Sequence, residues 1–195
     1  MSREIEIKYR LATGDVLDAR VVALGAKPHG RFLERSVILD QSDRTLLAAN
    51  SALRVRERIS LVAGATSAQR LLTFKGPLLD GGSVKQREEI ELTVSDFAAA
   101  VTLFERLGYR GVIYYERRRE TWRLGECEVA IDELPDRSTF VEIEGPSVAA
   151  VQACAQSLDL LDGDRDPVSY VEYAARNGKP ARGFDACLAF DDETR

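Results

Sequence analysis

Residues 4–8 read EIEIK, which places three ionisable side chains on one face of an expected strand. Because side chains along a strand point alternately to its two faces, Glu4, Glu6 and Lys8 share one face and two isoleucines share the other. Carboxylates gathered in this way are the oxygen ligands that Mg²⁺ and Mn²⁺ prefer, and a neighbouring lysine can bind an anion or transfer a proton. The question is whether this face meets solvent or a ligand.

The same alternation recurs in almost every later strand-like stretch, with charged residues on one face and apolar residues on the other. The charges are also sorted by sign: acids dominate at residues 4–6, 89–91 and 142–144, while bases dominate at 54–56 and 117–119. A solvated strand face usually includes Ser, Thr, Asn and Gln, and it has no reason to sort its charges. We therefore interpret the charged face as the lining of an interior site, with an ordinary solvated sheet face as the alternative.

Short turns separate most of the alternating stretches, which favours antiparallel pairing of the strands. Helix-like stretches with apolar stripes need a surface to cover, and the apolar face of the strands provides one. A turn is expected at residues 78–83. The expected strands cover residues 4–8, 31–40, 52–59, 70–77, 84–94, 112–123, 126–133 and 138–145, and the expected helices cover residues 14–25, 95–108, 147–161 and 168–176.

Closing such a sheet into a barrel removes its exposed edges. The sequence therefore predicts an α+β fold, a closed antiparallel eight-stranded β-barrel that forms a tunnel with a charged interior and carries helices on its outside. No long linker divides the chain, so we expect one domain over residues 1–176. Residues 177–195 are expected to be a C-terminal tail, in which Phe184, Leu188 and Phe190 are the residues that could dock.

The composition excludes several classes of protein. The net charge of −5 gives no reason to expect a nucleic-acid partner, and no apolar run has the length of a membrane span. Three widely spaced cysteines without a CxxC motif indicate neither a disulfide framework nor a zinc site, so we expect a reducing cytoplasm. Because His29 is the only histidine, any chemistry must use carboxylates, lysine and arginine.

These residue types predict the ligand of the interior site. Several converging carboxylates without histidine suit one or two Mg²⁺ or Mn²⁺ ions. Arginine and lysine opposite them bind phosphate, arginine through its paired donors and lysine as a point charge. Magnesium is usually held jointly by carboxylates and substrate phosphates. We therefore expect a small-molecule polyphosphate as the partner and attack at phosphorus as the chemistry.

Seven motifs and the stretch SYVEY at residues 169–173 occur in order along about residues 3–173, and together they resemble the CYTH superfamily, the triphosphate tunnel metalloenzymes. Arg117 stands where the family often has lysine, and the loop at residues 135–139 lacks the Gly-Leu-Gly of many relatives. The motifs are ExExK at Glu4–Lys8, LRxR at Leu53–Arg56, TFKGP around Lys75, RxExE at Arg87–Glu91, RRRETW at Arg117–Trp122, VAIDE with Asp132, and FVEIEG with Glu142 and Glu144.

The resemblance implies a role for each charged residue of the interior face. Lys8 is expected to position or deprotonate the attacking water, with a salt bridge to nearby carboxylates as the alternative. Arg58 and Arg118 are expected on the exterior or the rim. The expected ligands of the principal metal ion are Glu4, Glu6, Glu142 and Glu144; those of a second ion or its waters are Glu89, Glu91 and Asp132; and those of the triphosphate are Lys8, Arg54, Arg56, Lys75, Arg87, Arg117 and Arg119.

Three functions fit the resemblance. The first is a metal-dependent phosphohydrolase that cleaves inorganic tripolyphosphate, thiamine triphosphate or a nucleoside triphosphate. The second is a class IV adenylyl cyclase, which must also hold adenine, although no adenine-reading motif is evident. The third is a non-catalytic polyphosphate-binding module, which the full set of acids and bases disfavours. The sequence is compatible with a monomer or a homodimer.

Overall fold

The computed structural model describes residues 2–12, 17–64, 68–79 and 84–191 of the 195-residue chain. Residues 14–16, at the start of the first expected helix, and residues 80–83, in an expected turn, lie outside the described residues. Within the described part of the chain, no helix is both long enough and apolar enough to cross a membrane.

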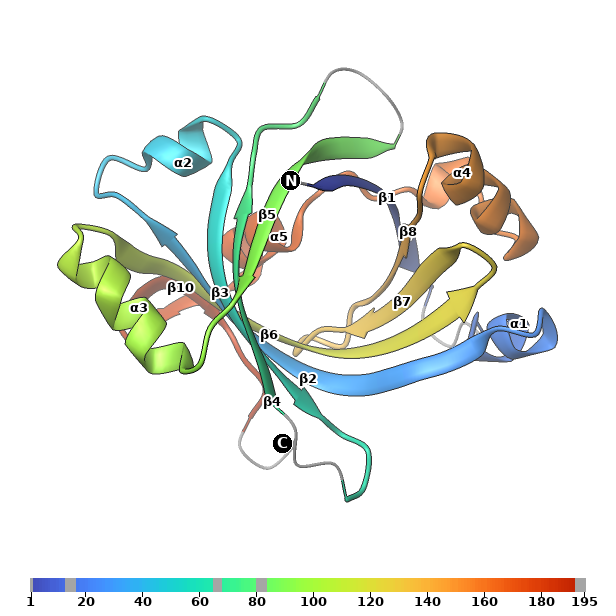
Figure 1. Cartoon of the computed structure of the whole chain (residues 1–195), viewed down its shortest axis with the longest axis horizontal. Coiled ribbons are helices and arrows are strands. Elements are labelled where there is room, and N and C mark those ends of the chain that lie inside the picture. The colour runs from blue at the N-terminus through green and yellow to red at the C-terminus, as the bar shows by residue number, and fades with distance from the viewer. Residues whose placement is uncertain (1, 13–16, 65–67, 80–83, 192–195) are drawn as a thin grey trace.

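Eight antiparallel strands close into a barrel (Figure 1), as predicted from the sequence. Neighbouring strands follow the order β2-β3-β4-β5-β1-β8-β7-β6, and the pairing of β6 with β2 closes the ring. The strands are β1 (Ser2–Leu11), β2 (Lys27–Asp40), β3 (Ala52–Ser60), β4 (Ala68–Lys75), β5 (Lys85–Thr93), β6 (Arg110–Leu124), β7 (Cys127–Glu133) and β8 (Thr139–Glu144).

Helices α1 and α4 lie outside the barrel on one side and α2 and α3 on the other (Figure 1), whereas residues of α5 line the interior cavity. Side chains of Asp96, Ser147 and Ser169 accept hydrogen bonds from backbone N–H groups in the first turns of α3, α4 and α5, which stabilises those helix starts. The helices are α1 (Leu17–Ala23), α2 (Thr45–Ala48), α3 (Phe97–Arg106), α4 (Val148–Ser157) and α5 (Tyr170–Asn177), with a 3₁₀ turn at Asp162–Asp164.

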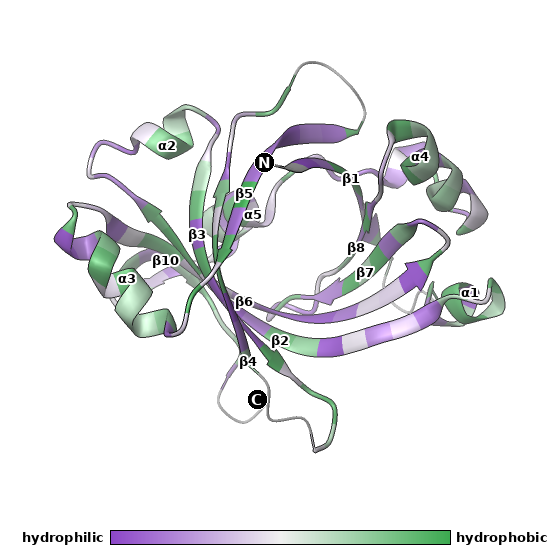
Figure 2. Ribbon diagram, in the orientation of Figure 1, coloured by the Kyte–Doolittle hydropathy of each residue, from purple (hydrophilic) through white to green (hydrophobic). Residues whose placement is uncertain are grey.

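Most of the apolar core surrounds the barrel, and one cluster around Tyr170 of α5 reaches its interior. Ile7, Val129 and Ile143 point outward from the strands and pack under α1 and α4, where they are almost completely buried. A second group around Val55 packs with residues of α3. Figure 2 shows the matching hydrophobic residues on α1, α3 and α4. Since strand side chains alternate, this arrangement leaves the interior to the charged face.

The segment after residue 177, predicted to be a tail, makes ordered contacts with the barrel. It forms β9 (Lys179–Ala181) and β10 (Phe184–Leu188), and β10 pairs in parallel with β6. The ring of Phe184 lies 5.5 Å from that of Tyr114, and the backbone N–H of Phe190 donates to the buried Glu116 carboxylate at 3.0 Å. A free edge on part of β6 explains the docking, because β7 pairs only with its second half. The extent of the domain stays a prediction.

Candidate functional site

A cavity of about 820 Å³ lies inside the barrel, and most of the predicted site residues line it. Lys8 and Asp132 are the predicted residues that do not. The lining includes the predicted residues Glu4, Glu6, Arg54, Arg56, Lys75, Arg87, Glu89, Glu91, Arg117, Arg119, Glu142 and Glu144.

A row of three carboxylates crosses one wall of the cavity. Glu6 on β1 is the register partner of Glu144 on β8, and Glu144 is the register partner of Glu128 on β7. Burial, together with the charges of Glu142 and Glu4, raises the pKa of Glu6. Partial burial of the Glu144 carboxyl, with Glu4 and Glu6 beside it, raises its pKa to about 7. Like charges on directly opposite residues destabilise a sheet. The wall that carries Glu6, Glu144 and Glu128, called the acidic wall below, therefore has an unfavourable excess of negative charge.

Lysines and an arginine border this acidic row. Burial acts to raise the pKa of Glu4, but Lys75 and Arg87 outweigh it and lower that pKa to about 2. Arg87 Nε donates to Glu4 Oε2 at 3.0 Å, and Lys75 Nζ contacts both Glu4 and Glu89. Lys85, which was not predicted, lies 3.7 Å from Glu6. Glu4 is thus paired with two cations at close range, whereas the ion pair between Glu6 and Lys85 is longer.

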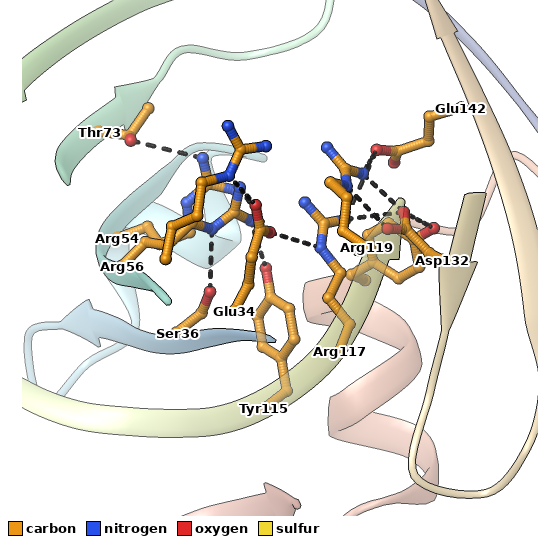
Figure 3. Close-up of polar contacts among 12 residues, drawn as sticks. Glu34, Ser36, Arg54, Arg56, Thr73, Tyr115, Arg117, Arg119, Asp132 and Glu142 are labelled. Atoms are coloured by element: carbon orange, nitrogen blue, oxygen red, sulfur yellow. Dashed lines mark hydrogen bonds and ion pairs between the residues drawn. The ribbon is translucent and has the colours of Figure 1, made fainter. Parts of the chain in front are cut away.

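Glu34 on β2 organises the opposite, basic wall (Figure 3). Its side chain is fully buried and accepts from Arg117 Nε at 2.7 Å and from Arg58 Nε at 2.8 Å, and Arg56 Nη1 lies 3.1 Å away. Burial opposes ionisation, but Arg117, Arg56, Arg119 and Arg58 hold the pKa of Glu34 well below its usual range. The carboxylate therefore fixes three guanidinium groups in place.

The same contacts correct one expectation about the arginines and support another. Arg58 was expected on the exterior or the rim, but it points inward to Glu34 because it continues the alternation of Arg54 and Arg56 along β3. Arg118 lies outside the barrel, where its guanidinium stacks 4.3 Å from the centre of the Phe190 ring and pairs with Glu133.

Asp132 acts as a counter-ion in this structure. It is fully buried and receives hydrogen bonds from Arg119 at 2.6 and 2.7 Å, from Arg117 at 3.1 Å and from the Tyr170 hydroxyl at 2.7 Å. Four donors occupy its two oxygens, which leaves little capacity for a metal ion or its waters. Glu142 is also engaged by Arg119 and lies 3.5 Å from Arg117. A metal-binding role for these two residues stays a prediction.

Lys8 is turned away from the cavity. Its Nζ donates to the carbonyl oxygen of Val168 and lies 4.5 Å from the centre of the Tyr170 ring and 4.9 Å from that of Phe140. Burial lowers the pKa of Lys8, although the charge of Glu142 opposes the change. Its predicted role at the attacking water therefore requires a rotation of the side chain.

Arg54 is held less firmly than Arg56. Its Nη2 donates to the Thr73 hydroxyl at 3.4 Å, and its buried Nε has no hydrogen-bond partner among the described residues. Arg56, in contrast, is fixed by Ser36 at 3.2 Å and by Glu34. Arg54 therefore has donor groups available for an anion in the cavity.

The donor set of the acidic wall fits a magnesium or manganese ion by its chemistry. Glu6 and Glu144 face each other with raised pKa values and carry the hard oxygen ligands that these ions prefer. Within the described ranges, no group of three or more His, Cys, Asp or Glu side chains is arranged to hold a metal ion. The residues thus supply the right atoms, and ligand positions around an ion are not preformed among them.

Comparison with known sequences gives a consistent result. A model of the CYTH domain family matches residues 2–161. A Methanocaldococcus jannaschii protein named "Putative adenylate cyclase" is 27% identical over 141 residues, which are 72% of this chain and 75% of the relative. An Aeromonas hydrophila adenylate cyclase is 28% identical over 141 residues, which are 72% of this chain and 67% of that protein.

Solved structures share the fold. A Pyrococcus horikoshii protein is 25% identical with a TM-score of 0.72, and the match covers 87% of this chain and 98% of that one. A Hippeastrum protein described as a "putative adenylyl cyclase" with "a dominant" triphosphatase activity is 20% identical with a TM-score of 0.63, over 92% of this chain and 98% of that one.

Proposed function

The chain belongs to the CYTH domain family, and from this we propose that it is a metal-dependent phosphohydrolase that cleaves a triphosphate inside the barrel. The observation that supports the proposal is the separation of charge across one cavity. Paired carboxylates with raised pKa values lie on β1 and β8, and arginines from β3 and β6 lie across from them. A polyphosphate with a divalent cation has the complementary charges.

On this proposal Arg54 and Arg56 bind the phosphate oxygens, since both line the cavity and Arg56 is held in position by Glu34. Glu6 and Glu144 hold Mg²⁺ or Mn²⁺, which neutralises phosphate charge when it is bound. Lys8 turns from Val168 and positions or deprotonates the water that attacks the terminal phosphorus, with diphosphate as the leaving group; its lowered pKa makes the ammonium easier to deprotonate.

Adenylyl cyclase activity is the second candidate, and one feature of the cavity favours it. Beyond the arginines the lining becomes apolar, with Ile38, Leu47, Ile113 and Val171, and Asn50 lies in the same lining. A cyclase must hold an adenine and a ribose next to the triphosphate, and such a surface gives room for them. Both curated relatives are named as adenylate cyclases, one of them "putative".

Product analysis tests both candidates. The purified protein is incubated with Mg²⁺ or Mn²⁺ and, separately, with ATP, thiamine triphosphate and inorganic tripolyphosphate. We expect release of inorganic phosphate, loss of activity after treatment with EDTA, and recovery when the metal is returned. Cyclic AMP with pyrophosphate would identify a cyclase instead. Full turnover after thorough metal removal, or binding without any product, contradicts the proposal.

A further inference from the structure

Tyr115 on β6 has no part in the proposal above, yet it lies at the centre of the basic wall. The residue is 2% exposed and lines the cavity. Its ring stacks on that of Tyr170, with 6.5 Å between centroids and 28° between planes, which fixes the position of the hydroxyl.

The neighbours of the Tyr115 hydroxyl are hydrogen-bond donors. Arg56 Nε donates to Ser36 Oγ at 3.2 Å, and Arg56 Nη2 donates to the Tyr115 hydroxyl oxygen at 3.5 Å. The Ser36 hydroxyl is a further hydrogen-bond partner of Tyr115. A phenol has one proton and two acceptor sites, so the Tyr115 hydroxyl can accept from Arg56 and still donate to an oxygen in the cavity.

We propose that the Tyr115 hydroxyl donates a hydrogen bond to a phosphate oxygen of the ligand that Arg54 and Arg56 bind. The inference rests on the proposed triphosphate ligand and adds a contact to it. Arg56 contacts the Tyr115 hydroxyl, so a phosphate bound by Arg56 lies beside that hydroxyl, and phosphate oxygens are strong acceptors. The hydroxyl thus adds a directional hydrogen bond to the contacts of the arginines.

The charges around the Tyr115 hydroxyl link its protonation to ligand binding. Arg54 and Arg56 face it from β3, Arg117 from β6, Ser36 and Glu34 lie on the adjacent β2, and Tyr170 packs on it from α5. Burial opposes ionisation, but the three arginines lower the pKa of Tyr115 to about 7. A bound polyanion offsets these arginines and raises the pKa again. Ligand binding near neutral pH therefore restores the proton that makes the hydroxyl a donor.

Tyr115→Phe tests the contact, and Tyr114→Phe is the matched control. Tyr114 is the preceding residue of the same strand, points to the outer face, and donates to Glu116 at 2.6 Å. Binding of inorganic tripolyphosphate is measured by calorimetry at neutral pH. Buffers of different ionisation enthalpy are compared, so that proton uptake on binding is measured together with affinity. We expect affinity to fall by roughly 10- to 100-fold in Tyr115→Phe, as for loss of a hydrogen bond to a charged group, and to stay near wild type in Tyr114→Phe.

Near-ultraviolet absorption of tyrosinate gives an independent readout on the unmodified protein. We expect one tyrosine to titrate near neutral pH in the wild type and in Tyr114→Phe, and its tyrosinate band to decrease when tripolyphosphate is added, with uptake of a proton. Equal affinity in a folded Tyr115→Phe overturns the inference. If the wild type binds tripolyphosphate but releases no phosphate, the proposed hydrolase fails while the contact stands. If the wild type does not bind tripolyphosphate, both fail.

Discussion

Glu6 on β1 and Glu144 on β8 are directly opposite each other in the barrel wall, and Glu6 forms an ion pair of 3.7 Å with Lys85. Burial raises the pKa of both carboxyls, and neighbouring carboxylates raise it further: Glu142 and Glu4 for Glu6, and Glu4 and Glu6 for Glu144. A divalent cation bound between the two carboxylates would relieve the repulsion between them. A substitution that removes one of the two charges should therefore lower catalysis, while the stability of the metal-free protein stays the same or rises.

Glu6→Gln should abolish most catalysis without lowering stability. The substitution keeps the shape of the side chain and removes one charge from the site expected to hold the cation, so turnover with saturating Mn²⁺ should fall by about a hundredfold or more. The melting temperature without metal should stay the same or rise, because repulsion with Glu144 is lost. Glu133→Gln, an acid on the outside of β7, is the control. Wild-type turnover in Glu6→Gln would contradict a role at the metal.

Asp132→Asn should have the opposite effect on stability. Asp132 is the shared acceptor of Arg117, Arg119 and Tyr170, so removing its charge leaves two buried guanidinium groups poorly compensated. Breaking a buried ion pair in this way costs roughly 3–5 kcal/mol. The free energy of unfolding, measured by denaturant titration of the metal-free protein, should fall by an amount of this order. An unchanged value would favour the metal-ligand role predicted from the sequence.

Arg54→Ala should weaken ligand binding and leave the fold intact. Arg54 has one long hydrogen bond to Thr73 and an unpaired Nε, so its removal disturbs few existing contacts. Loss of a charge-assisted contact to phosphate is worth roughly 1.5–3 kcal/mol, or about 10- to 150-fold in affinity. Tripolyphosphate binding by calorimetry measures the change, with Arg118→Ala on the outer face as the control. Equal loss in both variants would show a general charge effect.

The stability of the metal-free protein should fall as the pH rises from about 5 to about 7. The folded-state pKa of Glu144 is raised to about 7 from 4.5, so its contribution is fully present below the unfolded value and is lost as the pH passes the folded value. Glu6 has the same sign, whereas Glu4, with a pKa of about 2, titrates below this range. Melting curves of Glu144→Gln should show a smaller pH dependence than those of the wild type; an identical slope would exclude Glu144 as the cause.

Much of the site follows from alternation along single strands. The charged faces around Glu6, Arg56 and Glu89 each repeat with a period of two, and a barrel is one of the few ways to turn all of them inward. Glu34 could not be recognised in the same way. Its neighbours on the inner face of β2 are Phe32 and Ser36, so no charged row marks that face, and only the pairing with β3 and β6 shows what it contacts.

Other features depend on three-dimensional detail. Asp132 fits the period of an interior strand position, but the sequence gives no means of telling a metal ligand from a counter-ion until the neighbouring arginines are placed. Lys8 is likewise on the predicted face, yet the segment before α5 brings the Val168 carbonyl to it from a distant part of the chain. Arg58 and Lys85 were predictable, because each simply extends an alternation already identified by one more position.

Because β1 lies between β5 and β8, the barrel cannot close during synthesis until β8 has been made. The strand that carries Glu4 and Glu6 is translated first, but its partner Glu144 on β8 lies 138 residues after Glu6 in sequence. At typical translation speeds that interval is on the order of ten seconds. Contacts of such sequence separation form slowly, so the pairing of β1 with β8, which completes the acidic wall, should follow the local hairpins. A cation captured by these carboxylates would then act on a folding step, by removing the repulsion that opposes the final strand pairing.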